Sequence, residues 1–155
     1  MDTTFELENQ VFNFRVAGVW IENGHVLLHK QAGDLHWALP GGRAQMQEES
    51  KACLEREMKE ELDVAVEVDR LLCVVENFFS YDGRKFHEIG FYYLIHGTED
   101  QPYFQTGSFH GPEGKRLLYQ WVPFSEVPQM ALQPEFLRKA LSELPGETQH
   151  VIVSN

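Results

Sequence analysis

The sequence has few cysteines, no long apolar run and little positive charge. Two cysteines, Cys53 and Cys73, are too few for a disulfide framework, so we expect a reduced, cytoplasmic setting. The first ten residues, MDTTFELENQ, are acidic and polar, unlike a signal peptide. No apolar stretch is long enough to span a bilayer. These absences argue against a disulfide-stabilised secreted protein and against a membrane-spanning one.

Basic residues are outnumbered by acidic ones. The chain has 13 Lys and Arg residues and 24 Asp and Glu residues, which gives a formal net charge of −11. A chain this acidic is a poor partner for a nucleic-acid polymer or for an anionic membrane. No internal repeat, low-complexity tract or linker divides the 155 residues, so we predict a single domain over residues 1–155 with a sizeable core.

One stretch, residues 41–64, organises the rest of the chain. It reads GGRAQMQEESKACLEREMKEELDV, and apolar residues recur at every fourth position, at Leu54, Met58 and Leu62. This spacing predicts a helix from Gln47 to Leu62 that buries one stripe against a sheet.

The second half of that helix is strongly acidic. Glu57, Glu60 and Glu61 follow Arg56 directly or within five positions, and on a helix their side chains fall within an arc of roughly 100°. Carboxylates clustered in this way repel one another unless a cation lies among them. The pattern therefore indicates a divalent metal site.

The spacing of the stretch also resembles a family signature. Gly42, five residues, Glu48, seven residues and then Arg56-Glu57-Met58-Lys59-Glu60-Glu61 resemble the Nudix (MutT-like) hydrolase box. Six fixed letters in one register arise by chance in about one of 10⁵ chains of this length. The chain departs from the box at Asp63, where the family has a Gly just past the helix, in a conformation that is often left-handed.

The resemblance implies hydrolysis of a diphosphate linked to another moiety, with Mg²⁺ or Mn²⁺ as cofactor. By that resemblance, Glu57, Glu61 and the carbonyl of Gly41 are metal ligands, and Glu60 is either a ligand or hydrogen-bonded to one. The base that deprotonates water is Glu57 or a carboxylate from a later loop. Glu48 and Arg56 are expected to pair and brace the loop on the helix.

Two further acids are candidates for the site. Glu113 belongs to the polar stretch from Gly97 to Lys115, whose length suggests a functional loop, and it could be the extra metal ligand or base. Glu88 lies within a predicted strand and could face either the metals or solvent.

The remaining chain is dominated by strands. Asn23-Gly24 predicts a two-residue hairpin turn, and Tyr81-Asp82-Gly83-Arg84 predicts another turn. A closing amphipathic helix is predicted at Pro134 to Leu144, followed by an irregular extension from Gly146 to Asn155. We therefore predict an α+β fold, and the resemblance sharpens this to an α/β/α sandwich with a mixed central sheet. The predicted strands are Val11–Ile21, His25–His29, Val64–Phe79, Phe86–His96 and Leu117–Val122.

Several other side chains are candidates for substrate contacts. Arg15 and Arg84 could bind phosphate or ribose, although single arginines are usually surface residues. The seven histidines show too little convergence for zinc. The aromatic strand Phe86 to Ile95 could form an interface in a homodimer. Aromatic residues that could stack on a base are Trp37, Phe78, Phe79, Tyr81, Tyr103 and Phe104.

The favoured hypothesis is a metal-dependent pyrophosphohydrolase that cleaves a nucleoside triphosphate or a nucleoside diphosphate linked to another moiety. Its partner would be a small nucleotide. The alternative is a nucleotide-sensing module on the same fold without useful turnover. A third, weaker alternative is an isomerase of allylic diphosphates, which would need a catalytic cysteine in a pocket, with Cys73 as the candidate.

Overall fold

The computed structural model describes residues 1–98 and 103–154. The strands in this part of the chain are β1 (Thr4–Leu7), β2 (Gln10–Glu22), β3 (His25–Gln31), β4 (Gly41–Arg43), β5 (Val66–Tyr81), β6 (Arg84–Gly97), β7 (Ser108–His110), β8 (Leu117–Pro123) and β9 (Gln149–Ser154). The helical elements are α1 (Ser50–Leu62), the 3₁₀ turn η1 (Val127–Gln129) and α2 (Leu137–Ala140).

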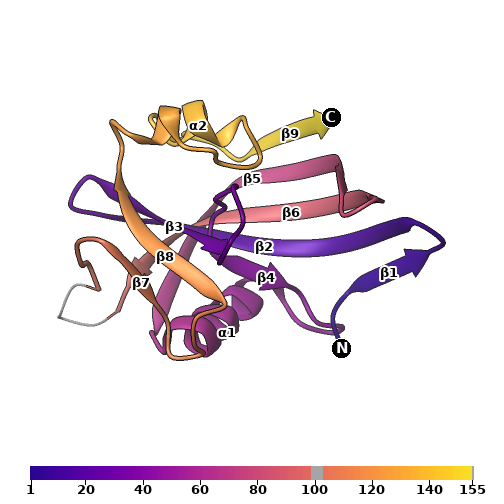
Figure 1. The fold of residues 1–155 in the computed structure, drawn as a ribbon, viewed down its shortest axis with the longest axis horizontal. Helices are drawn as coiled ribbons and strands as arrows, with labels where there is room; N and C mark the ends of the chain where they lie inside the picture. Colours follow the sequence, from indigo (N-terminus) through magenta and orange to yellow (C-terminus); the bar gives the residue numbers. More distant parts are fainter. Residues whose placement is uncertain (99–102, 155) are drawn as a thin grey trace.

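The strands form one mixed sheet between two helical layers (Figure 1). The strand order is β7-β8-β3-β2-β6-β5-β9, with β1 and β4 also paired to β2. The β2–β6 and β5–β9 pairs are parallel, whereas the others are antiparallel. Helix α1 covers one face, and η1 with α2 covers the other. The predicted α+β class and sandwich arrangement are confirmed, with the second helical layer much thinner than the first.

Both predicted turns are present and join strands that pair with each other. Asn23 and Gly24 have φ angles of 49° and 71°, and Asp82 and Gly83 have φ angles of 52° and 74°. Two consecutive positive φ values are typical of the tight turn that matches the twist of a hairpin. Local residue chemistry therefore accounts for the β2–β3 and β5–β6 connections.

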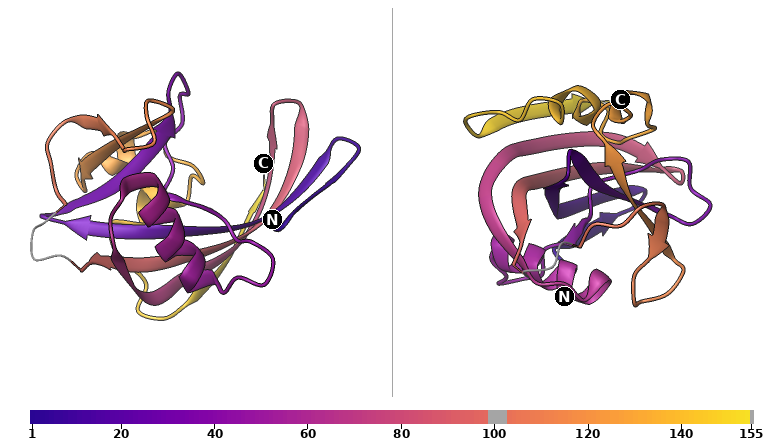
Figure 2. Two further views of the ribbon diagram at one scale, coloured as in Figure 1. Left: turned by 90° about the horizontal axis from the view of Figure 1, so that it is seen from below. Right: turned by 90° about the vertical axis from the view of Figure 1, so that its left-hand side faces the viewer.

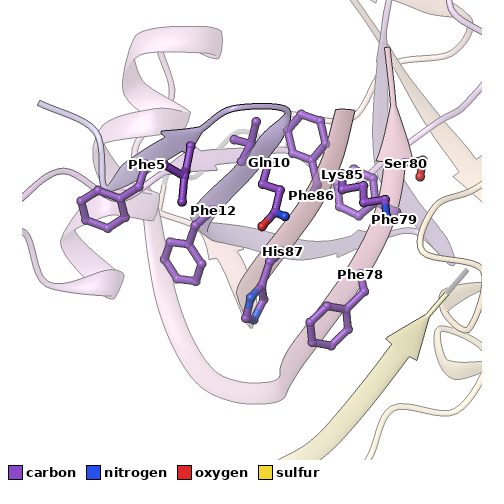
Figure 3. A pocket seen from close by; sticks show the side chains of 11 residues that line it. Phe5, Gln10, Phe12, Phe78, Phe79, Ser80, Lys85, Phe86 and His87 are labelled. Atoms are coloured by element: carbon purple, nitrogen blue, oxygen red, sulfur yellow. The ribbon is translucent and has the colours of Figure 1, made fainter. Parts of the chain in front are cut away.

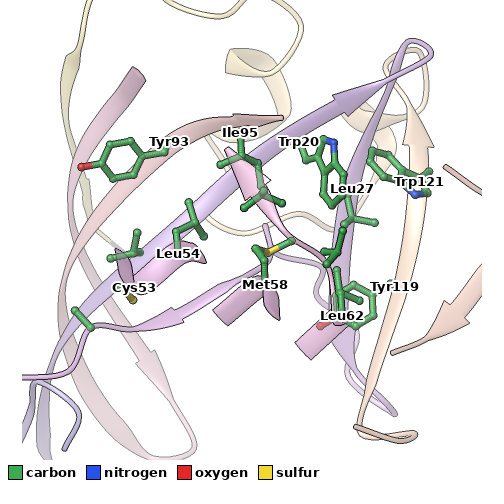
Figure 4. Packing of buried hydrophobic residues seen from close by; sticks show 14 residues of the cluster. Trp20, Leu27, Cys53, Leu54, Met58, Leu62, Tyr93, Ile95, Tyr119 and Trp121 are labelled. Atoms are coloured by element: carbon green, nitrogen blue, oxygen red, sulfur yellow. The ribbon is translucent and has the colours of Figure 1, made fainter. Parts of the chain in front are cut away.

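Helix α1 is anchored by the predicted apolar stripe. Leu54, Met58 and Leu62 are buried against Trp20 of β2 and Ile95 of β6, among other residues (Figure 4). Removing a buried Leu or Met side chain of this kind typically costs about 2–5 kcal/mol. The helix begins at Ser50 rather than at Gln47, because Gln47 has a φ of 67° and is not helical. The packing holds the acidic edge of the helix in one position relative to the sheet.

Asp63 ends helix α1 in the left-handed conformation, with φ 53° and ψ 42°. Its N–H donates to the Lys59 carbonyl at 3.0 Å, and the Lys59 ammonium lies 2.7 Å from its carboxylate. The residue that departs from the Nudix pattern thus adopts the backbone geometry expected of the glycine it replaces.

The end of the chain differs from the prediction. The predicted helix from Pro134 to Leu144 is reduced to α2, because before this turn and again from Ser142 onward the backbone hydrogen bonds run between residues three apart. The predicted irregular extension contains β9, which runs parallel to β5. Val151 and Val153 of β9 pack on the core, while Ile152 faces outward. Long-range pairing, which local sequence patterns do not reveal, creates this strand.

The aromatic strand proposed as a dimer interface is β6, in the middle of the sheet between β2 and β5. Because β6 pairs with a strand on each side, it has no open edge to which a second copy could add a strand. Its Tyr92 and Tyr93 are also buried. The β1–β2 and β5–β6 hairpins project side by side beyond α1 (Figure 2). None of the helices in the described part of the chain has the length and hydrophobicity needed to cross a bilayer.

Candidate active site

The glycine pair at the start of the motif brings strand β4 close to both β2 and α1. Gly41 pairs with Ala17 of β2, and a Cβ on Gly41 would overlap the Val16 carbonyl. A Cβ on Gly42 would overlap the carboxyl group of Glu57. The missing side chains therefore make room for the backbone of β2 on one side and for an acidic side chain on the other.

Arg56 connects three carboxylates. Its Nε and Nη2 donate to the two oxygens of Glu48 at 2.6 and 2.9 Å, and its Nη1 donates to Glu57 and Glu60 at 3.0 and 3.1 Å. Glu48 also accepts the Gln45 N–H at 3.0 Å. The hydrogen bonds from Arg56 are the main reason that the pKa of Glu48 is lowered to about 2. The fork geometry ties the loop before α1 to the helix, in the arrangement expected of a bracing pair.

Glu57 and Glu61 are the carboxylates that burial affects most within the motif. Burial raises the pKa of Glu57, and it raises the pKa of Glu61 to about 7. Tyr119 of β8 donates its hydroxyl hydrogen to Glu61 Oε2 at 2.9 Å. Repulsion from Glu57 further raises the pKa of Glu61. Glu60 differs, since about half of its side chain is exposed and its carboxylate is directed at Arg56.

Glu113 lies beside Glu61, although the two are far apart in the sequence. Gly111 packs so closely on the Glu61 backbone that a Cβ there would overlap the Glu61 carbonyl. Glu61, Glu113 and Tyr119 line the same small recess, and the charge of Glu113 also raises the pKa of Glu61. The described part of the 97–115 loop thus places the exposed carboxylate of Glu113 next to Glu61 of the motif. Residues 99–102 of that loop lie outside the described residues.

A divalent cation fits the chemistry of this cluster. Burial raises the pKa of both Glu57 and Glu61, and the charge of Glu57 raises that of Glu61 further, effects that a bound cation would reverse. Within residues 1–98 and 103–154, no three His, Cys, Asp or Glu side chains converge into a complete metal site. Hard cations that bind phosphate typically use few protein ligands and take the remaining oxygens from substrate and water.

Gly41 and Glu61 of the motif line a cleft of about 650 Å³, together with Glu88 of β6. Five of the 13 Lys and Arg residues line this cleft, together with four acids, so the cleft is far less acidic than the protein as a whole, whose net charge is −11. The four acids are Asp34, Glu61, Asp82 and Glu88. Arg15 is oriented by a hydrogen bond to the Leu39 carbonyl at 2.8 Å, and its charge lowers the pKa of both Glu57 and Glu61. The cationic residues of the cleft are Arg15, Lys30, Arg43, Arg84 and Arg116.

The sequence does not reveal that these five cationic residues share one cleft. The sequence marks Arg15 and Arg84 as possible phosphate or ribose ligands or as ordinary surface residues, and it gives no such indication for Lys30, Arg43 and Arg116. They come from separate elements and meet only when the sheet forms. Their spacing along the chain carries no common signal.

Most of the aromatic candidates serve the core or another surface. Phe79 and Tyr81 line the cleft, whereas Tyr103 stacks on Trp20 with ring centroids 5.5 Å apart. Trp37 and Phe104 likewise pack on core residues. Phe78 lies in a separate groove of about 540 Å³, where it follows Phe5, Phe12 and His87 in a row across four strands (Figure 3).

The cysteines are buried rather than placed in the cleft. Cys53 packs between α1 and the sheet, and burial raises the pKa of its thiol to about 12. Cys73 packs on the opposite face, and burial raises the pKa of its thiol as well. Neither is poised as a thiolate nucleophile, so the structure does not support the isomerase alternative.

Comparison with known proteins identifies the family. The NUDIX domain model matches residues 13–144 of the chain. The chain therefore belongs to the NUDIX family, and it is an enzyme of the Nudix hydrolase type, which acts on phosphoanhydride bonds. Members of this family generally use divalent metals. No curated protein sequence matches the chain significantly.

Solved structures share the fold at low sequence identity. A MutT NUDIX hydrolase from Burkholderia pseudomallei is 24% identical, with a TM-score of 0.64 over 82% of this chain and 95% of that one. The MutT protein from Bacillus halodurans is 18% identical, with a TM-score of 0.62 over 89% of each chain. An ADP-ribose pyrophosphatase from Streptococcus suis is 17% identical, with a TM-score of 0.59 over 89% of this chain and 98% of that one.

Proposed function

We propose that the protein is a Mg²⁺- or Mn²⁺-dependent pyrophosphohydrolase. Its substrate would be a nucleoside triphosphate or a nucleoside diphosphate linked to another moiety. The observation that carries the proposal is that two features meet at one cleft. Glu61 lines the cleft together with five cationic side chains, and the charge of Glu57 acts on Glu61 from the same helix. The two acids suit a hard cation, and the five cationic side chains suit a polyphosphate.

Each group of the cluster has a separate task in this proposal. Glu57, Glu61 and the Gly41 carbonyl would hold the metal, with Glu60 as a further ligand or as a hydrogen-bonding neighbour. The metal, when bound, would supply positive charge that offsets the charge of the phosphate oxygens. Arg56 and Glu48 keep α1 in place on the loop before it, through the hydrogen bonds described above.

The phosphate chain would be oriented mainly by arginine. Arg15 lies close enough to Glu57 and Glu61 to lower the pKa of both, so a diphosphate bound by Arg15 would reach the acids. Its hydrogen bond to the Leu39 carbonyl limits the positions that the guanidinium can take. Arginine suits this task because its planar group matches the geometry of phosphate oxygens.

Hydrolysis requires a water oxygen to form a bond to phosphorus while the bridging P–O bond breaks. The bridging oxygen leaves with the bonding electrons, and the water proton passes to a carboxylate. Glu57 and Glu113 are the two candidates for that base. Glu57 has a pKa raised by burial, which favours proton acceptance, and Glu113 lies beside Glu61 on the later loop.

Product analysis of the purified chain tests the proposal. Nucleoside triphosphates, ADP-ribose, dinucleoside polyphosphates and nucleotide sugars would be incubated with Mg²⁺, with Mn²⁺ or with a chelator. We expect metal-dependent release of a nucleoside monophosphate or diphosphate. Glu57→Gln should lower kcat by about 10²-fold or more. The matched control is Glu55→Gln, an exposed residue of the same helix, which should leave kcat unchanged.

The same experiment separates the enzyme from the sensing module. Tight nucleotide binding without product in any metal would favour the sensor. Unchanged turnover in the Glu57→Gln protein would remove the proposed mechanism. A homodimer and a cytoplasmic setting stay predictions, and light scattering on the purified chain would test the first.

A further inference from the structure

Glu88 is a buried acid of the cleft that lies outside the Nudix motif. It sits on β6, in register with Asn13 of β2 and Asn77 of β5. All three side chains lie on the same face of the sheet, and each residue is at least nine-tenths buried. Glu88 and Asn77 line the cleft. These three buried polar side chains, two amides and one carboxyl group, need hydrogen-bond partners, because burying polar groups without hydrogen bonds is unfavourable.

One side of the Glu88 carboxylate is already occupied. The Thr4 hydroxyl lies 2.8 Å from Asn13 Oδ1 and 3.0 Å from the Phe12 carbonyl and can donate its one hydrogen to either. When it donates to Asn13 Oδ1, the amide N–H groups of Asn13 are left for Glu88. Burial raises the pKa of Glu88, and the neighbouring Asn13 side chain, in register with it on β2, partly offsets this by favouring the charged carboxylate. Thr4 and Asn13 therefore orient the Glu88 carboxylate from one side. Its remaining acceptor positions are available to a ligand in the cleft, which Glu88 lines.

Glu88 is separated from the proposed metal ligands by Arg15. The charge of Arg15 lowers the pKa of Glu57, Glu61 and Glu88, so the guanidinium lies near all of them. On β2, Arg15 pairs with Gly90 of β6 on one side and with Arg43 of β4 on the other, so it lies between the strand of Glu88 and the strand whose Gly42 adjoins Glu57. A substrate whose phosphates contact Arg15 and the acids would therefore present its non-phosphate part to Glu88.

We propose that Glu88, oriented by Asn13 and supported by Asn77, determines specificity by accepting two adjacent hydrogen-bond donors from the nucleoside part of the substrate. This inference rests on the proposed function of the same cleft. The two oxygens of a carboxylate accept a pair of parallel donors, and a site built for such a pair rejects ligands that lack one.

Two parts of a nucleotide carry adjacent donors. The guanine edge has N1–H next to the 2-amino group, whereas the corresponding edges of adenine, cytosine and uracil have no two adjacent donors. The ribose 2′ and 3′ hydroxyls form the other pair. GTP has both pairs, ITP lacks the 2-amino group, and dGTP lacks the 2′ hydroxyl. Comparison of these three nucleotides therefore identifies which pair Glu88 accepts.

The experiment measures kcat/KM for GTP, ITP, dGTP and ATP with the wild-type protein, Glu88→Gln and Glu67→Gln. Glu67 is an exposed acid on β5 and serves as the matched control. In the wild type we expect ITP or dGTP to fall below GTP by about 10- to 100-fold, mostly through KM. Glu88→Gln should abolish that difference, because an amide offers one acceptor and one donor. If the base is the source, the variant should also gain activity on ATP relative to GTP.

Binding provides a readout that does not need turnover. Calorimetry with the α,β-methylene analogues of GTP, ITP and dGTP should show the same order of affinity in the wild type and its loss in Glu88→Gln. Thermal unfolding checks that the variant is folded. If no nucleotide is hydrolysed but this order persists, the proposed function fails and the assignment of Glu88 stands. Equal values for the three nucleotides in the wild type, or discrimination that survives Glu88→Gln, would overturn the assignment.

Discussion

The carboxyl group of Glu57 occupies the space that a side chain on Gly42 would fill. This contact links the first fixed position of the motif to one of its acids, fifteen residues later in the chain. The glycine is therefore required for the position of an acidic group as well as for the shape of the turn.

Gly42→Ala should displace the Glu57 carboxylate while leaving the fold intact. Because a misplacement of about 1 Å at a reacting group costs on the order of 10²-fold, we expect a loss of about 10- to 100-fold in kcat. Gly146→Ala is the control, since a Cβ there meets no atom within 4 Å. Steady-state kinetics on the best nucleotide from the substrate panel measure the effect, and equal kcat in both variants would contradict this account.

Arg56→Lys retains the positive charge but loses the fork that binds Glu48. A lysine cannot make the two parallel hydrogen bonds of 2.6 and 2.9 Å. We expect the free energy of unfolding to fall by about 1–3 kcal/mol in urea titrations. Arg70→Lys alters an exposed arginine that bonds only the Pro145 carbonyl among the described residues, and it should change stability little. Similar midpoints for the two variants would show that charge alone matters at position 56.

Tyr119→Phe removes the hydroxyl that bonds Glu61. Without this donor, the Glu61 carboxylate is less firmly oriented, and we expect Mn²⁺ affinity to fall by about 10-fold or more. Electron paramagnetic resonance titration of free Mn²⁺ measures this directly. Tyr81→Phe, at an exposed tyrosine, should bind Mn²⁺ as the wild type does. An unchanged Mn²⁺ affinity in Tyr119→Phe would exclude a positioning role for that hydroxyl.

Glu61 should make the metal-free protein less stable as the pH rises. Its pKa is about 7 in the folded protein and about 4.5 when unfolded, so the folded state binds the proton more tightly. This contribution favours folding at pH 5 and is lost as the pH rises through about 7. His29 acts in the opposite direction, because burial lowers its pKa to about 3 and the unfolded state takes up a proton below about 6.5.

The Glu61→Gln variant separates the pH dependence that comes from Glu61 from the pH dependence that comes from His29. Urea unfolding with a chelator should show that the variant gains stability over the wild type as the pH goes from 5 to 8, by about 1–3 kcal/mol in total. The His29 contribution is the same in both proteins and cancels in the difference. A difference that is constant between pH 5 and pH 8 would refute the raised pKa.

Asp63→Gly should stabilise the protein. Asp63 has a φ of 53°, a conformation that costs a residue with a Cβ more than it costs glycine. The exposed ion pair with Lys59 that is lost contributes little. We expect a gain of up to about 1 kcal/mol in the free energy of unfolding and no change in kcat. A loss of stability would mean that the ion pair outweighs the backbone strain.

The sequence by itself determined the features that depend on near neighbours along the chain. The Asn23-Gly24 and Asp82-Gly83 turns follow from residues that tolerate positive φ. The stripe of Leu54, Met58 and Leu62 predicted the packed face of α1, and the opposite edge could then be recognised as a carboxylate cluster. These features were predictable because turn geometry and helical periodicity link residues only a few positions apart.

The tertiary structure alone decided which distant residues complete the site. Arg15, Glu88 and Tyr119 come from three strands and Arg116 directly precedes one of them, so their positions around the motif depend on sheet order and register. The same long-range pairing made a strand of the C-terminal segment. Register depends on how whole faces of the sheet pack, which no short stretch of sequence encodes. The local sequence was therefore enough to identify the acids of the motif on α1. Packing of the whole sheet decided which cationic residues, and which proposed specificity residue, share the cleft with them.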